Sequence, residues 1–226
     1  MLCYQEFLKN GKYTDLMLKG LDKDGWICTV PCHKIIMAAS FGERFLKFIC
    51  QPNNYLSAGN STLKALVDFA YNFPVNVSNE NLSELLKFSS SYFHQDFAKI
   101  LGSYLLKNIT IENALETFQL AQEGIPHERD SLQLIKAFIV KKRFLKLNQI
   151  SSGFKNVPLP IMRELVKDDH LGISEEELFT LITQWGFERE SLFYDVRFSF
   201  IEEKFFKANV QTNKSRTLKK AMNASR

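Results

Sequence analysis

The fold of this chain is decided by residues 15–18, DLML, and residues 26–40, WICTVPCHKIIMAAS. As strands, the first segment would place Leu16 and Leu18 on one face, and the second would place Trp26, Cys28 and Val30 on one face, which predicts two short strands. The charged turn 23–25 (KDG) joins them. Pro31 is expected to end the second strand, and the apolar run from Ile35 predicts a helix that follows it directly.

Length and composition favour packed domains over disorder, because 45% of the 226 residues are hydrophobic. The length suits two domains of roughly 100–150 residues each. The longest apolar runs are far shorter than the ~20 residues of a membrane helix, and residues 1–12 contain charged side chains where an export signal would be apolar. The four cysteines are too few for a disulfide scaffold. We therefore expect a soluble protein of the cytoplasm or nucleus.

The net charge of +4 is located at one end of the chain. Seven basic residues and no acidic residue follow Glu203, so residues 1–203 carry a net charge of −3. A mildly acidic body with a basic end is a common surface pattern, and nucleic-acid binding is not expected from it. Residues 211–226 are interpreted as a basic tail.

Two segments resemble the BTB/POZ domain. The opening stretch matches the family's pattern of a strand, a second strand and a His-Lys-led helix at Asp15, Cys32, His33, Lys34, Ala38, Ala39 and Ser40. Residues 66–71 (LVDFAY), within a predicted helix over 61–72, are similar to the family's Leu-x-x-Phe-x-Tyr helix. Two further predicted helices, one from Leu82 and one around Phe97, resemble the BTB helical hairpin. The resemblance implies an α+β BTB/POZ domain over residues 1–109.

The second half of the chain is predicted to be helical throughout. Its best-defined helix begins at Ser174, where Ser174 and Glu177 have the spacing of a capping box ahead of an apolar stripe that ends at Trp185. This half resembles the BACK domain of Kelch-like proteins. The similar segments are 113–115 (NAL), 120–121 (LA), 138–139 (FI), 171–179 (LGISEEELF), Trp185 and 196–198 (VRF). An all-helical BACK domain over residues 110–210 is therefore expected, and a mostly helical fold overall.

Two features depart from the BACK and Kelch-like pattern. Ser199 stands where the family usually has proline, and no segment of the 226 residues resembles a Kelch repeat. We expect either that such repeats follow in a longer chain or that the protein works without them.

The resemblance implies a dimeric substrate adaptor of a cullin-RING ubiquitin ligase, in which the BTB half dimerises and docks on the cullin. The dimer interface would combine an apolar N-terminal helix with three polar residues: Leu2, Tyr4, Phe7, Leu8, Asp15, His33 and Lys34. The three polar side chains are expected to satisfy one another as a buried cluster; the alternative is a set of ordinary surface charges.

The expected cullin contacts are seven apolar or aromatic side chains and one amide: Phe48, Ile49, Gln51, Tyr92, Phe93, Ile109, Leu115 and Phe118. Cullin-binding BTB domains commonly carry a hydrophobic-x-Glu motif in this region, but this chain has no acidic residue between Glu43 and Asp68. Gln51 is the nearest equivalent, and an amide lacks the charge assistance of a carboxylate, a difference of about 1–2 kcal/mol. A self-associating scaffold or competitor that does not recruit the ligase is the alternative function.

No catalytic motif is present in the sequence, since it has no Gly-rich phosphate loop, Gly-x-Ser-x-Gly elbow or His-Glu-x-x-His. The residues Cys28, Cys32, His33 and Cys50 could be drawn as a zinc site, but no second pair follows at zinc-finger spacing. Cys50 with His94 or His127 could be drawn as a nucleophile and base, without support from any motif. We expect no enzyme activity, no cofactor and no metal.

Overall fold

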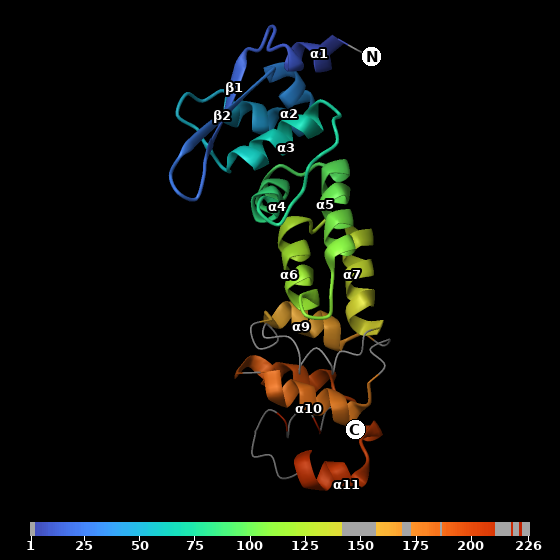
Figure 1. Cartoon of the computed structure of the whole chain (residues 1–226). Helices are drawn as coiled ribbons and strands as arrows, with labels where there is room; N and C mark the ends of the chain where they lie inside the picture. The colour runs from blue at the N-terminus through green and yellow to red at the C-terminus, as the bar shows by residue number, and fades with distance from the viewer. Residues whose placement is uncertain are drawn as a thin grey trace. The chain divides into compact units, whose positions relative to one another are not determined.

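The computed structural model describes residues 3–141, 157–168, 173–185 and 187–210, together with residues 218 and 222. This part of the chain is mostly helical with one small sheet, so the expected α+β class is confirmed (Figure 1). The chain divides into two compact units, residues 1–108 with 120–132 and residues 109–119 with 133–226. The inclusion of residues 120–132 in the first unit was not expected. The assignments of residues 1–109 to BTB/POZ and 110–210 to BACK stay predictions.

The sheet of the first unit has three strands: β1 (Leu16–Leu21), β2 (Ile27–Cys32) and β3 (Leu56–Ser57). β1 is central, antiparallel to β2 along its whole length and parallel to β3 only at Gly20 and Leu21 (Figure 1). Gly20 is needed because a Cβ there would lie 2.2 Å from the carbonyl oxygen of Ala58. The sequence did not predict β3.

The expectation that Pro31 ends the second strand is wrong. β2 runs through Pro31 to Cys32, and Pro31 stands opposite Met17 of β1. Within the sheet that the structure describes, β2 is an edge strand, which is where a residue without a backbone N–H is tolerated. Trp26 lies just before β2, and 74% of its surface is exposed.

Five helices belong to the described part of residues 1–108: α1 (Cys3–Lys9), α2 (Lys34–Ile49), α3 (Asn60–Ala70), α4 (Leu82–Ser91) and α5 (Gln95–Asn108). The sequence predicted a helix at each of these five places, and these predictions are confirmed. α2 is interrupted at Gly42, whose φ of 82° is a conformation that favours glycine. Aromatic rings from α2, α3, α4 and α5 form the core, with neighbouring centroids 4.9–6.1 Å apart: Phe41, Phe45, Phe69, Phe88 and Phe97.

The described residues after Asn108 are also mostly helical. They contain α6 (Ala114–Gly124), α7 (Arg129–Lys141), α9 (Leu159–Val166), α10 (Glu175–Trp185), the 3₁₀ segments η2 (Phe187–Asp195) and η3 (Phe198–Phe200), α11 (Glu203–Phe205) and the π-helical turn η4 (Phe206–Val210). The predicted capping box is confirmed. The Ser174 hydroxyl accepts the Glu177 N–H at 3.2 Å, and the Glu177 carboxylate accepts the Ser174 N–H at 2.9 Å.

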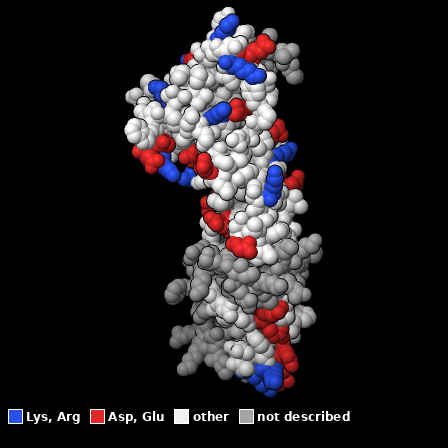
Figure 2. Space-filling model, in the orientation of Figure 1, with Lys and Arg blue, Asp and Glu red and all other residues white. Residues whose placement is uncertain are grey.

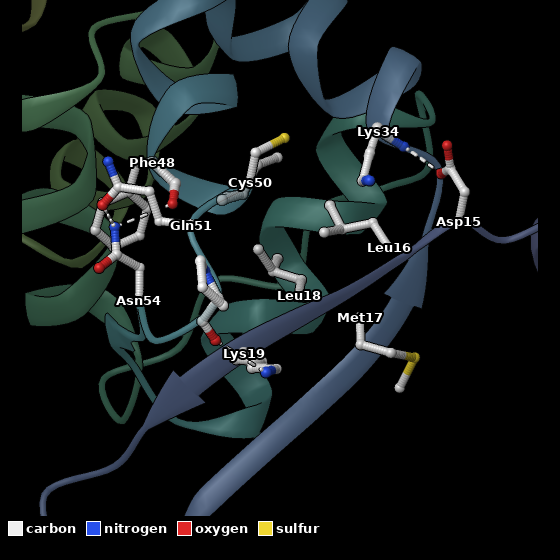
Figure 3. Close-up of a pocket in the computed structure, with 12 residues that line it drawn as sticks. Asp15, Leu16, Met17, Leu18, Lys19, Lys34, Phe48, Cys50, Gln51 and Asn54 are labelled. Carbon is white, nitrogen blue, oxygen red and sulfur yellow. Dashed lines mark hydrogen bonds between the residues drawn. The ribbon is translucent and has the colours of Figure 1, made fainter.

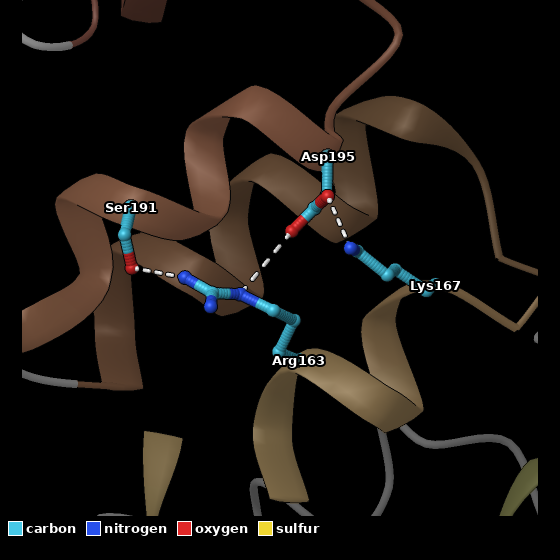
Figure 4. Close-up of polar contacts among 4 residues, drawn as sticks. All are labelled: Arg163, Lys167, Ser191 and Asp195. Carbon is cyan, nitrogen blue, oxygen red and sulfur yellow. Dashed lines mark hydrogen bonds and ion pairs between the residues drawn. The ribbon is translucent and has the colours of Figure 1, made fainter. Parts of the chain in front are cut away.

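Ion pairs connect α9 to η2 in the second unit. Asp195 at the end of η2 lies 4.0 Å from Arg163 Nε on α9 and 3.6 Å from Lys167 Nζ, directly after that helix (Figure 4). Arg163 also donates to the Ser191 hydroxyl at 2.9 Å. A single exposed ion pair contributes about 0–1 kcal/mol to stability. A carboxylate that is shared by two cations can hold α9 and η2 together more effectively than such a pair.

A second pairing in this unit involves two segments that carry the BACK resemblance. The carboxylate of Glu175, at the start of α10, accepts the Arg197 side-chain Nε–H at 2.6 Å and the Arg197 backbone N–H at 3.0 Å. Because Glu175 is buried, its charge depends on these two bonds.

The surface of the described residues is mixed in charge. Figure 2 shows lysine and arginine side chains interspersed with aspartate and glutamate over the visible face of the first unit. No helix of the described part of the chain is long and apolar enough to cross a membrane. The predicted basic tail lies outside the described residues except for Leu218, which is helical and buried, and Met222.

Replacement of Trp185 by alanine is expected to lower the free energy of unfolding by about 3–5 kcal/mol. Trp185 is only 5% exposed and belongs to the core beside Leu178 and Leu181 of the same helix. The matched control is Trp26→Ala, which removes the other, exposed tryptophan and should change stability by no more than about 0.5 kcal/mol. Urea denaturation measures both, and equal losses in the two variants would contradict this assignment of the core.

Candidate functional site: interaction surfaces of the first unit

The end of α2 and the corner between α4 and α5 bring three of the expected cullin contacts together. The Phe48 and Tyr92 rings lie 6.1 Å apart, and Tyr92 also packs against Phe45 at 5.0 Å. Phe93, one residue further, is 47% exposed and contacts the His127 ring at 5.1 Å. Phe93 thus exposes an aromatic ring directly after Tyr92, and exposed aromatic rings are frequent anchors of protein interfaces.

Gln51 lies in the turn that follows α2. Its side-chain oxygen accepts a hydrogen bond from the Asn54 amide at 2.6 Å, and the same amide donates to the Phe48 carbonyl at 3.1 Å (Figure 3). Asn54 thus fixes the end of α2 and orients Gln51, a role that no sequence motif indicated. Ile49 is half-buried beside this turn.

The three remaining expected contacts belong to the second unit. Leu115 and Phe118 are only 2% and 1% exposed, so both are core residues and present no surface to a partner. Their assignment as cullin contacts is therefore withdrawn. Ile109 is half-buried and stays a candidate.

The apolar residues expected at a dimer interface are only partly described. Leu2 and the side chain of Tyr4 lie outside the described residues, whereas Phe7 and Leu8 of α1 are half-buried. Phe7 contacts the ring of Tyr13 edge-on at 5.3 Å. α1 is also held to the body of the unit, because the Gln5 side-chain amide donates to the Tyr71 carbonyl at 2.7 Å.

The three polar residues expected at the dimer interface lie close together but do not bind one another's side chains as expected. Asp15 is exposed, and its carboxylate accepts the backbone N–H of Lys34 at 2.8 Å, at the start of α2 (Figure 3). The imidazole of His33 instead bonds to the Tyr71 hydroxyl through Nδ1 and to the Lys12 carbonyl through Nε2 at 3.0 Å.

Tyr71 is therefore the centre of this junction, which sequence reasoning did not identify. Its hydroxyl accepts the backbone N–H of His33 at 2.9 Å in addition to its bond with the imidazole. Because the Lys12 carbonyl can only accept, Nε2 of His33 donates to it. His33 thus links the end of α3, the start of α2 and the segment between α1 and β1.

A cavity of about 210 Å³ lies between the first half of β1 and the end of α2 (Figure 3). Leu16 and Leu18 of β1 line it together with Lys34, Cys50 and Gln51. In the part of the chain that the structure describes, no group of three or more histidine, cysteine, aspartate or glutamate side chains is arranged to hold a metal ion.

Stability is expected to fall as the pH rises from about 9 to about 12. Burial raises the pKa of the Cys32 thiol from 9.0 to about 12 and that of the Tyr71 hydroxyl from 10.0 to about 12. The unfolded chain therefore loses these protons at lower pH than the folded protein, which favours unfolding by on the order of 1.4 kcal/mol per pH unit and group.

Urea denaturation at pH 8, 9, 10 and 11 measures this decline. In the Cys32→Ala variant the free energy of unfolding should fall less steeply between pH 9 and 10. Cys50→Ala removes an exposed cysteine and should leave this pH dependence unchanged. A free energy of unfolding that stays constant from pH 8 to 11 would contradict the burial of both groups.

The chain was compared with families and with curated proteins. No family model matches the chain. It is 22% identical to Kelch repeat and BTB domain-containing protein 3 of Mus musculus over 66% of this chain and 25% of that protein. It is 21% identical to Kelch-like protein 41b of Danio rerio over 92% of this chain and 36% of that protein. With Kelch-like protein 38 of Danio rerio the identity is 24%, over 91% of this chain and 37% of that protein.

The chain spans about a quarter to two fifths of the length of these relatives. The matches to the two Danio rerio proteins nevertheless cover more than nine tenths of this chain. The resemblance expected from the sequence motifs is therefore confirmed: over most of its length this chain is similar to Kelch-like and Kelch repeat and BTB domain-containing proteins.

Proposed function

We propose that this chain is a protein-interaction module that acts as a dimeric substrate adaptor of a cullin-RING ubiquitin ligase. The observation that carries the proposal is the exposed aromatic ring of Phe93, which follows Tyr92 in the chain, while the Tyr92 ring packs against Phe45 and Phe48 of α2. Similarity to Kelch-like proteins supports the same function. A cytoplasmic or nuclear location is part of the proposal.

In this proposal the cullin contact has an apolar part and a polar part. Phe93 supplies the largest exposed apolar surface at the corner, and the half-buried rings of Phe48 and Tyr92 supply the rest. Gln51 occupies the polar position, with its side-chain oxygen already bonded to Asn54. Compared with a glutamate at this position, the Gln51 amide can still accept a hydrogen bond from the cullin, but this bond is weaker because it lacks charge assistance.

The second candidate function is a self-associating scaffold or competitor that does not recruit the ligase. The absence of any acidic residue between Glu43 and Asp68 favours it, because this is the region where the hydrophobic-x-Glu motif is expected. Both functions use the first unit for dimerisation, so only cullin binding separates them.

Dimerisation is expected to require the apolar face of α1. Replacing the half-buried Leu8 by glutamate places a charge on this face and should shift the protein from dimer to monomer mass. Light scattering at micromolar concentration measures the mass, with Glu6→Gln on the exposed side of α1 as the matched control. A native chain of monomer mass would overturn the dimer.

Cullin binding is expected to be measurable but weak in the native chain. Gln51→Glu should tighten it by up to about tenfold, equivalent to ~1.4 kcal/mol. The glutamate can still accept from Asn54, although a negative charge after the last turn of α2 costs about 0.3–1 kcal/mol of folding stability. Phe93→Ala should weaken binding at least about tenfold if the ring is an anchor.

Titration calorimetry with a cullin N-terminal domain decides between the two functions. Leu134→Ala removes an equally exposed apolar side chain from α7 and should leave the affinity unchanged. Binding by the native chain that Phe93→Ala weakens supports the adaptor. No binding by either the native chain or Gln51→Glu favours the scaffold.

A further inference from the structure

In the part of the chain that the structure describes, β1 has a full-length neighbour on only one side. All six residues of β1 are paired with β2, whereas β3 reaches only Gly20 and Leu21. Among these described strands, none lies beside residues 16–19 on the side of β3. An uncovered strand edge is a template for the addition of another strand.

The hydrogen-bond pattern shows which backbone groups face this uncovered side. The Asp22 N–H donates to the Trp26 carbonyl, and the Ala58 N–H donates to the Leu21 carbonyl, both at 3.0 Å. Because bonding alternates along an antiparallel strand, even-numbered residues of β1 bond to β2 and odd-numbered residues face β3. The N–H groups of Met17 and Lys19 therefore point to the uncovered side. Within the described part of the chain, neither amide donates to a loop carbonyl or a side chain.

The 210 Å³ cavity lies against this uncovered edge. Met17 lines the cavity although its side chain is directed to the opposite side of β1 (Figure 3), so the lining atoms of Met17 belong to its backbone. Cys50 and Gln51 form the facing wall. The space is thus bounded by unpaired backbone on one side and by the turn after α2 on the other.

The charge around the cavity favours an acidic ligand. Lys19 and Lys34 both line it, and the one carboxylate among the lining residues, Asp15, is already bonded to the Lys34 backbone N–H. Lys19 Nζ lies 3.4 Å from the Pro52 carbonyl, which leaves its positive charge unneutralised.

We propose that this cleft is a strand-addition site that binds an extended acidic peptide segment of another protein. Such a segment would place carbonyl groups against the N–H groups of Met17 and Lys19, because extended backbone presents them at the same two-residue spacing, roughly 6.6 Å. A carboxylate of the segment would lie beside the Lys34 ammonium group. The cleft shares the turn after α2, including Gln51, with the proposed cullin contact, but the groups that would pair with the segment are backbone amides of β1, so its test does not depend on cullin binding.

The probe is the capped peptide acetyl-Asp-Val-Thr-Val-Glu-amide, added to the full chain and followed by amide NMR. At saturation the amides of Met17 and Lys19 should exchange with solvent at least about tenfold more slowly, and that of Leu18 should not change, because it already bonds to β2. A matched peptide with two consecutive N-methylated amides keeps the charge but cannot pair as a strand, and it should not bind.

Three variants test the side-chain part of the site. Cys50→Phe fills the cavity and should abolish binding, and Lys34→Gln should weaken it about two- to fivefold. Lys23→Gln removes the same charge from the exposed hairpin turn and should have no effect. Circular dichroism checks that each variant is folded, and the amide measurement on the native chain does not depend on them.

Equal binding of both peptides would contradict the strand-addition site, because it would show that the peptide's charge alone causes binding. The site is also overturned if the peptide does not bind at about 1 mM or shifts amides elsewhere. If the Met17 and Lys19 amides already exchange slowly without peptide, and exchange more slowly still at higher protein concentration, the edge is covered by a second copy of the chain instead.

Discussion

The first unit depends on the two hydrogen bonds between the hydroxyl group of Tyr71 and His33. Tyr71 is fully buried at the end of α3, and His33 stands where β2 gives way to α2. The other ring nitrogen of His33 reaches the carbonyl of Lys12, before β1. A buried hydroxyl without partners would cost about 1–3 kcal/mol, so the network is satisfied only when these three segments take their observed positions. Asp15 completes it by bonding the first N–H of α2.

This junction also places the two candidate interaction surfaces. The register of β1 against β2 determines which backbone groups face the uncovered edge, and the start of α2 determines where its far end and Phe48 lie. The two surfaces differ in character. The corner at Phe93 is aromatic and suits an apolar partner, whereas the cleft at Met17 offers unpaired amides and two lysines and suits an acidic strand.

The sequence predicted the elements whose signals are local. The capping box of Ser174 and Glu177 requires only residues within one helical turn, and both its bonds are present. β3 was missed because two residues show no alternation, and its pairing depends on Gly20, far away in the chain. Pro31 was misinterpreted because a proline ends a central strand but is tolerated in an edge strand, and strand order is not visible in a sequence.

The candidate site was predictable only in part for a similar reason. An apolar residue on a helix can face the core or a partner, and the sequence does not distinguish them: Phe93 is exposed, whereas Leu115 and Phe118 are buried. The contact between Tyr71 and His33 joins residues 38 positions apart, and the bond from Asn54 to Gln51 has no motif. These side chains could be assigned roles only from the folded structure.

The proposed cullin contact consists of the aromatic corner and the turn after α2. Hydrogen–deuterium exchange of the native chain, with and without a cullin N-terminal domain, tests this most directly, because it locates the contact on the chain. We expect slower exchange in residues 48–54 and 92–95 and little change around Trp26. Protection confined to other segments, or no protection at saturating cullin, would contradict it.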